Sequence, residues 1–222
     1  MYVPTSSRAR SITLTLAAVA LAACSEPTTA PEGIALTAND PAFATAAPQP
    51  AVARLEIDYM METIDHHLAG IEMAELCVQR VPNPTLHQDA ALVEMCEESI
   101  VEQQRQIDLY RTWLQDWYGI TYVGEIPQSA EQDIERLSEM FGEEFENEFL
   151  TEMSMHHLMI IKRSEQVVRR AYHEELRSEA RSTIVKQSRG VIQMQTWDCS
   201  WFGDCRTGLK QQAERFLSQY ES

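Results

Sequence analysis

Two pairs of adjacent histidines are the residues of this chain best suited to bind a metal ion. His66 and His67 stand in the segment TIDHHLAG, and His156 and His157 stand ninety residues later in SMHHLMII. Both segments have the apolar spacing of a buried helix face, where an imidazole needs a hydrogen-bonding partner or a metal ion. Whether the two pairs can form one site depends on the elements that carry them.

From residue 54 onward, apolar residues recur every three or four positions, which predicts an all-α chain with no sheet. Pro82 and Pro84 end the first long helix, and the others are expected over about 86–117, 143–171 and 174–198. A capping box, Ser129 with Gln132, predicts a short helix that ends near Gly142. An amphipathic helix follows over residues 206–222.

The two halves of this region repeat each other. The histidine pairs and the glutamates Glu62 and Glu152 align at an offset of ninety residues. Gln103 aligns with Gln187 at an offset of eighty-four, as Trp113 does with Trp197. Two duplicated hairpins, about 54–117 and 143–198, predict an antiparallel four-helix bundle over residues 54–205.

Helix phase predicts which histidines point inward. His67 and His157 lie on the apolar faces, His66 lies nearer the flank, and the phase of His156 is ambiguous. One polar layer through the bundle is expected to contain the residues at equal distance from the hairpin turns, which are His67, Gln103, His157 and Gln187. This layer is either a hydrogen-bonded arrangement that fixes register or a metal site in which His66 and His156 assist the inward pair.

Four methionines lie within two turns of the histidines, namely Met60, Met61, Met153 and Met159. Thioether sulfur with imidazole suits Cu(I), or Ag(I), although methionine also fills apolar cores. Glu62 and Glu152 each precede a histidine by four residues, so they either orient those rings or make surface contacts. A di-iron site requires Glu-x-x-His, a spacing that the sequence lacks.

The N-terminal residues predict export. Arg8 and Arg10 precede a short apolar stretch, so residues 1–23 resemble a signal peptide, and LAAC resembles a lipobox that ends at Cys24. Cys24 would then carry a lipid; an ordinary secretory signal is the alternative. Residues 24–53 are rich in Pro, Ala and Thr and are expected to form a disordered tether. Ser25 favours the outer membrane, with the domain facing the periplasm.

Four further cysteines suggest two disulfides in an oxidising compartment. Cys77–Cys96 and Cys199–Cys205 are the simplest of the three possible pairings. The formal net charge of −16 argues against nucleic-acid binding, which needs a basic patch. Such a charge favours cations or serves solubility, and the sequence indicates no particular protein partner.

Two stretches carry a resemblance to a known family. DYMMETIDHHLAGIEMAELC (58–77) and SIVEQQRQIDLYRTWL (99–114) resemble the family called domain of unknown function 305, over roughly residues 55–198. The resemblance implies a ferritin-like four-helix bundle, and some members bind copper in the periplasm and aid copper resistance. Gln106 stands where the family has Glu, and its counterpart in the second repeat is Gly190.

Other soft-ligand positions also differ between the repeats. Met73-Ala74 becomes Arg163-Ser164, and Met60 and Met61 correspond to Leu150 and Thr151. The sequence therefore predicts a membrane-tethered protein that sequesters or passes on copper or silver, without an enzymatic motif. The alternatives are a structural or interaction domain with a hydrogen-bonded His/Gln layer, and an oxidase with a non-standard metal site.

Overall fold

The computed structural model describes residues 47–81 and 87–221, and every regular element in these ranges is a helix. The helices are α1 (Pro50–Arg80), α2 (His87–Tyr118), α3 (Gln128–Ser138), α4 (Gly142–Arg170), α5 (Glu174–Phe202) and α6 (Thr207–Tyr220). The predicted signal peptide, Cys24 and the tether as far as residue 46 lie outside the described residues. Within those described ranges, no helix combines the length and the apolar character that crossing a bilayer requires.

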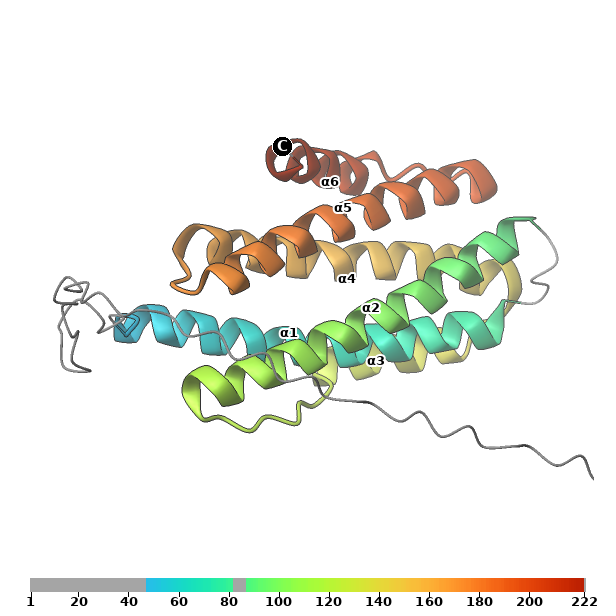
Figure 1. The fold of residues 1–222 in the computed structure, drawn as a ribbon. Helices are drawn as coiled ribbons and strands as arrows, with labels where there is room; N and C mark the ends of the chain where they lie inside the picture. Colours follow the sequence, from blue (N-terminus) through green and yellow to red (C-terminus); the bar gives the residue numbers. More distant parts are fainter. Residues whose placement is uncertain (1–46, 82–86, 222) are drawn as a thin grey trace, which may run out of the picture. The chain divides into compact units, whose positions relative to one another are not determined.

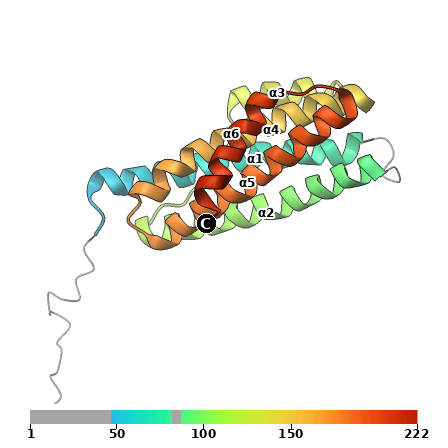
Figure 2. The same ribbon diagram turned by 90° about the horizontal axis from the view of Figure 1, so that it is seen from above.

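Two antiparallel hairpins, α1–α2 and α4–α5, form the four-helix bundle, which confirms the predicted fold (Figure 1). Close packing joins α1 to α2, α4 to α5, and α1 to α4. The short helix α3 packs on α1 and α4, and α6 lies along α5 (Figure 2). The first repeat therefore meets the second through α1 and α4, the two helices that carry the histidine pairs.

Several helix ends differ from the sequence prediction. Helix α1 begins at Pro50 rather than at residue 54, because proline fits the first helical position, where a backbone N–H would have no partner. Helix α3 begins at Gln128 with Pro127 as its N-cap, so the predicted capping box is wrong and Ser129 lies inside the first turn. Helix α5 continues past residue 198 to Phe202 and ends at Gly203, whose φ of 75° is left-handed.

Two of the apolar clusters in the core lie at different heights of the bundle. One includes Cys77, Phe149 and Met153, and the other includes Tyr59, Ile64 and Ile160. Along α1 and α4, the histidine pairs fall between the residues of these two clusters. The histidines therefore occupy a polar level between these two apolar clusters.

Stacked tryptophans show the duplication in three dimensions. Trp113 stacks on Trp117 with ring centroids 4.8 Å apart, and Trp197 stacks on Trp201 with centroids 4.9 Å apart. Each pair lies at the end of the second helix of its hairpin, at equivalent positions. The repeated pattern therefore places the same side-chain contact in both halves.

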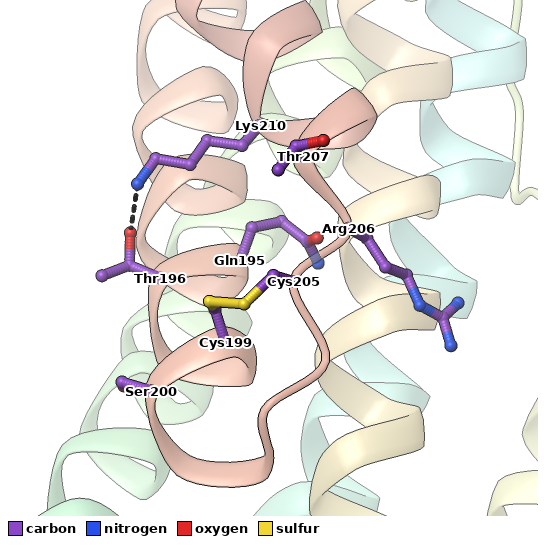
Figure 3. A pocket seen from close by; sticks show the side chains of 8 residues that line it. All are labelled: Gln195, Thr196, Cys199, Ser200, Cys205, Arg206, Thr207 and Lys210. Carbon is purple, nitrogen blue, oxygen red and sulfur yellow. Dashed lines mark hydrogen bonds between the residues drawn. A yellow bond between two sulfur atoms is a disulfide. The ribbon is translucent and has the colours of Figure 1, made fainter.

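Both local cysteine pairs expected from the sequence are bonded in the structure. Cys77–Cys96 joins α1 to α2, and Cys199–Cys205 joins α5 to the segment before α6. Figure 3 shows the second disulfide beside Lys210, which donates a hydrogen bond to Thr196 at 3.0 Å. The disulfide and this hydrogen bond hold the start of α6 against α5.

Candidate metal centre

Helices α1 and α4 bring the four predicted histidines into one cluster. The rings of His66 and His156 stack with centroids 3.6 Å apart and an interplanar angle of 22°. His67 lies 5.7 Å from His66, and His157 lies 6.3 Å from His156, between ring centroids. The rings that stack across the two halves are thus His66 and His156, whereas the sequence predicted that His67 and His157 would meet. Since α1 and α4 are neighbours, the residues on their facing flanks come into contact.

Burial keeps the imidazoles of this cluster neutral. His67 is fully buried, and His156 and His157 are 6% and 8% exposed. Desolvation lowers the pKa of His66 and of His157 to about 3, and that of His67 to about 4. Burial and the neighbouring imidazoles also hold the pKa of His156 well below its ordinary value. Each ring is therefore neutral at neutral pH and retains a nitrogen lone pair that could bind a metal.

Each histidine also has a buried ring nitrogen with no hydrogen-bond partner among the described residues. His66 Nε2 donates to the backbone oxygen of His156 at 2.9 Å, and His67 Nε2 donates to Gln106 Oε1 at 2.6 Å. The nitrogens that remain are Nδ1 of His66, Nδ1 of His67, Nε2 of His156 and Nδ1 of His157. Buried polar atoms normally have partners, so these four nitrogens are the atoms of the cluster that could each bind a metal ion.

Gly70 provides the space in which Gln103 approaches the histidines. A Cβ at this position would overlap Gln103 Oε1 and lie 2.9 Å from His156 Nε2, so both atoms border the same small space. The Gln103 amide donates to Ser99 Oγ at 2.7 Å, and its oxygen has no partner among the described residues. Only glycine on α1 leaves room for this arrangement.

The four residues of the predicted polar layer are buried as expected, but their hydrogen bonds differ from the prediction. His67, Gln103, His157 and Gln187 are all buried. The partner of His67 is Gln106, one helical turn beyond Gln103, and the Gln106 amide donates to Glu179 at 2.7 Å and to Thr183 at 2.9 Å. Sequence reasoning gave Gln106 no role at the site, although its place three residues after Gln103 puts it on the same helix face.

The second repeat lacks this partner. Gly190 occupies the position equivalent to Gln106, and a Cβ there would lie 3.3 Å from His157 Cδ2. His157 and Gly190 border a groove between α2 and α5, which Gln103 and Gln187 also line. On the other side of the cluster, His66 and His156 border a pocket beside the start of α3. Both sides of the histidine cluster therefore have an approach from the surface.

The structure separates the four candidate methionines. Met60 is buried and Met61 is partly buried, and both pack in the apolar cluster around Tyr59 and Ile64. Met153 borders a small cavity with His157, whereas Met159 is 56% exposed and lines the pocket with His66 and His156. Met95 also lines the cavity beside His157, and the sequence gave no reason to choose it. Of the predicted four, Met153 and Met159 each line a hollow that a histidine also borders.

The two predicted carboxylates bind arginines instead of orienting the histidines. Glu62 forms an ion pair with Arg163, and Glu152 binds Arg136 at 2.7 Å. These contacts agree with the alternative that the glutamates make surface contacts. Over residues 47–81 and 87–221, no three side chains of histidine, cysteine, aspartate or glutamate converge in a way that could hold a metal ion. His66 and His156 stack face to face, and methionine sulfur is a type of ligand outside this set.

Comparisons with known proteins identify one family and one set of related folds. The pattern of the family described as "Domain of unknown function (DUF305)" matches residues 56–198. "CopM in the Cu(I)-bound form" superposes with a TM-score of 0.57 at 22% identity, covering 66% of this chain and 97% of that chain. "CopM in the Ag-bound form (by soaking)" gives 0.56 at 23% identity, covering 66% and 96%. "CopM in the Cu(II)-bound form" gives 0.57 at 22% identity, covering 66% and 97%. No curated protein sequence compared with the chain matches it.

Proposed function

Because this chain belongs to the domain of unknown function 305 family, we propose that it binds Cu(I) or Ag(I) in the bacterial envelope and sequesters or passes on the ion. The observation that carries the proposal is the cluster of four imidazoles, each with a buried ring nitrogen that has no hydrogen-bond partner among the described residues. An unpaired buried polar atom costs about 1–3 kcal/mol. A bound soft cation would remove part of that penalty, since imidazole and thioether are ligands that Cu(I) favours.

The cluster residues would serve the ion by holding the rings in a defined state. The His156 carbonyl and Gln106 Oε1 accept the Nε2 protons of His66 and His67, which holds each of these two rings in one tautomer. Because the rings are neutral, they can bind a cation without first losing a proton. The copper- and silver-bound structures of CopM, which has a similar fold, support this choice of ion.

The location belongs to the same proposal and rests on the sequence. A lipid on Cys24 would anchor the mature chain, and residues 25–46 would separate the bundle from the membrane. The outer membrane, with the bundle in the periplasm, is the expected position. The bound ion would then be held outside the cytoplasm.

The test is a Cu(I) titration of the mature chain with Cys24→Ser, against a chromophoric chelator and without oxygen. The variant His66→Ala/His67→Ala/His156→Ala/His157→Ala should weaken binding by at least a hundredfold while the circular dichroism stays helical. His87→Ala is the control, since α2 begins at this residue, about 28 Å along the helix from Gln106. Wild-type protein that binds no copper, or a fourfold variant that binds it equally well, would contradict the proposal.

One observation favours a structural alternative. The hydrogen bonds from His67 through Gln106 to Glu179 and Thr183 connect α1, α2 and α5 without any metal. A hydrogen-bonded core layer of this kind can specify the register of a bundle. If the wild type binds no copper, this structural role is the better supported function.

A further inference from the structure

We infer that the two repeats have divided their roles, so that His67 supports the fold while His157, Met153 and Met95 hold the ion. This inference rests on the proposed function and adds its ligands. It follows from a difference between equivalent positions, Gln106 in the first repeat and Gly190 in the second.

The first-repeat histidine is fixed by a network that spans three helices. His67 Nε2 donates to Gln106, Gln106 donates to Glu179, and Arg105 forms an ion pair with Glu179. Turning the His67 ring would break its bond to Gln106 in a fully buried environment. Of the four rings, His66, His156 and His157 line the three hollows beside the cluster, and His67 lines none of these.

The second-repeat histidine instead borders a small cavity. Gly190 places no side chain beside it, and the cavity of about 40 Å³ is large enough for one ion. Its lining residues are Ala74, Met95, Cys96, Ser99, Phe149, Met153, His157 and Gly190. Cys96 is bonded to Cys77 and offers no thiolate, so the metal-binding groups of the cavity are one imidazole and two thioethers.

The chemistry of these three ligands favours some metal ions over others. One neutral imidazole and two neutral thioethers suit a soft monovalent cation such as Cu(I) or Ag(I), whereas zinc and magnesium prefer thiolate, imidazole or oxygen. His157 is nine-tenths buried, and the ring edge that carries Cδ2 and Nε2 faces Gly190, where a Cβ would lie 3.3 Å from Cδ2 and 3.5 Å from Nε2. Ala74 and Phe149 give the cavity apolar walls.

A path from the surface leads to this cavity. The groove between α2 and α5 shares Met95, Ser99, His157 and Gly190 with the cavity. Glu98 and Glu102 line the groove on α2, and Lys186 and Arg189 line it on α5, where Lys186 binds Glu102 at 2.6 Å. Met95 and His157 therefore border both the groove and the cavity.

The decisive experiment replaces single methionines in the mature chain. Met95→Leu and Met153→Leu each keep the side-chain volume and should weaken Ag(I) and Cu(I) binding by at least tenfold. Met60→Leu, also a buried methionine but in the other core cluster, should change the affinity by less than twofold. With methyl-labelled methionine, one equivalent of Ag(I) should shift the NMR signals of Met95 and Met153 and leave that of Met60 in place.

A second variant restores the glutamine of the first repeat. Gly190→Gln should give His157 an amide partner, fill the cavity and reduce ion binding at least tenfold, with helicity unchanged. If this variant does not fold, the methionine variants decide. Binding that survives in both methionine variants but is lost in His66→Ala/His156→Ala would overturn this inference and leave the proposed function standing. Wild-type protein that binds neither ion overturns both.

Discussion

His66 and His156, equivalent residues of the two repeats, stack on each other with ring centroids 3.6 Å apart. The same relationship recurs on α2 and α5, where the equivalent residues Glu102 and Lys186 bind each other at 2.6 Å. Both contacts join equivalent residues of the two hairpins. Two neutral imidazoles can share such a contact, whereas two imidazolium ions would repel each other, so the fold favours the neutral state.

This preference predicts that stability falls with acid earlier than in most proteins. The pKa is about 4 for His67 and about 3 for His157 in the folded chain, against an ordinary value of 6.5. Below pH 6.5 the unfolded chain therefore takes up protons that the folded chain does not, and the free energy of unfolding falls as the pH is lowered. Each of these two histidines should reduce it by about 2 kcal/mol between pH 7 and pH 5. Urea unfolding of metal-free protein at both pH values measures this change.

The control is His67→Gln, which should lose its share of this pH dependence. Asp198 acts in the opposite direction, since burial raises its pKa to about 6 and the folded chain binds a proton that the unfolded chain releases. Because Asp198 is present in both proteins, the difference between wild type and His67→Gln in the pH dependence of the free energy of unfolding reports on His67 alone. Equal slopes between pH 7 and pH 5 would show that His67 is not held neutral.

Gly70→Ala should destabilise the protein although alanine is the better helix former. The added Cβ would displace Gln103 Oε1 and approach His156 Nε2, and overpacking of this kind costs about 2 kcal/mol. Gly208→Ala, where a Cβ would meet nothing within 4 Å, is the matched control and should stabilise α6 by up to about 1 kcal/mol. Thermal unfolding of both variants gives the comparison, and a stabilised Gly70→Ala protein would contradict the packing argument.

Gln106→Ala should cost about 3 kcal/mol, because His67 is fully buried and water cannot replace the lost acceptor. Glu179 and Thr183 lose a donor in the same variant. Gln104→Ala removes an exposed glutamine that binds only Asp108 and should change stability by less than about 0.5 kcal/mol. Similar denaturation midpoints for the two variants would show that the His67 network does not support the fold.

The sequence predicted the bundle because helical spacing and the repeat offsets are properties of the chain itself. Apolar residues three and four apart identify the buried faces, and equal distance from the turns gives the shared height of His67 and His157. The duplicated Trp113 and Trp197 each stack on the tryptophan four residues later, as a repeat requires.

Contacts between helices were predicted less well. Helix phase shows that His67 points inward, but the stacking of His66 on His156 depends on which helices are neighbours and how they are rotated. Gln103 and Gln106 lie on the same face, and the choice of Gln106 as partner depends on side-chain reach and on the space beside Gly70. The cavity beside His157 likewise exists because Gly190 has no side chain to fill it.

Glu56 connects both hairpins, and its substitution should be the most destabilising of these changes at neutral pH. Its buried carboxylate accepts hydrogen bonds from the backbone N–H groups of Tyr172 and His173 at 2.6 and 2.9 Å, and from the Tyr118 hydroxyl. Burial raises the pKa of Glu56, but these bonds together lower it below its ordinary value. The stabilisation is therefore present above about pH 4.5 and is lost as the pH falls through the lowered pKa.

Glu56→Gln keeps the size of the side chain and removes its charge and one acceptor. The free energy of unfolding at pH 7 should fall by about 3–4 kcal/mol, since the backbone donors at the start of α5 lose an anionic partner. Glu174→Gln, an exposed residue of the same helix end that pairs with Arg177, should change it by less than about 0.5 kcal/mol. Urea titrations at pH 7 and pH 3.5 separate the two cases, because the difference in free energy of unfolding between wild type and Glu56→Gln should become smaller in acid. If this difference in free energy of unfolding does not change with pH, the carboxylate charge of Glu56 does not hold the hairpins together.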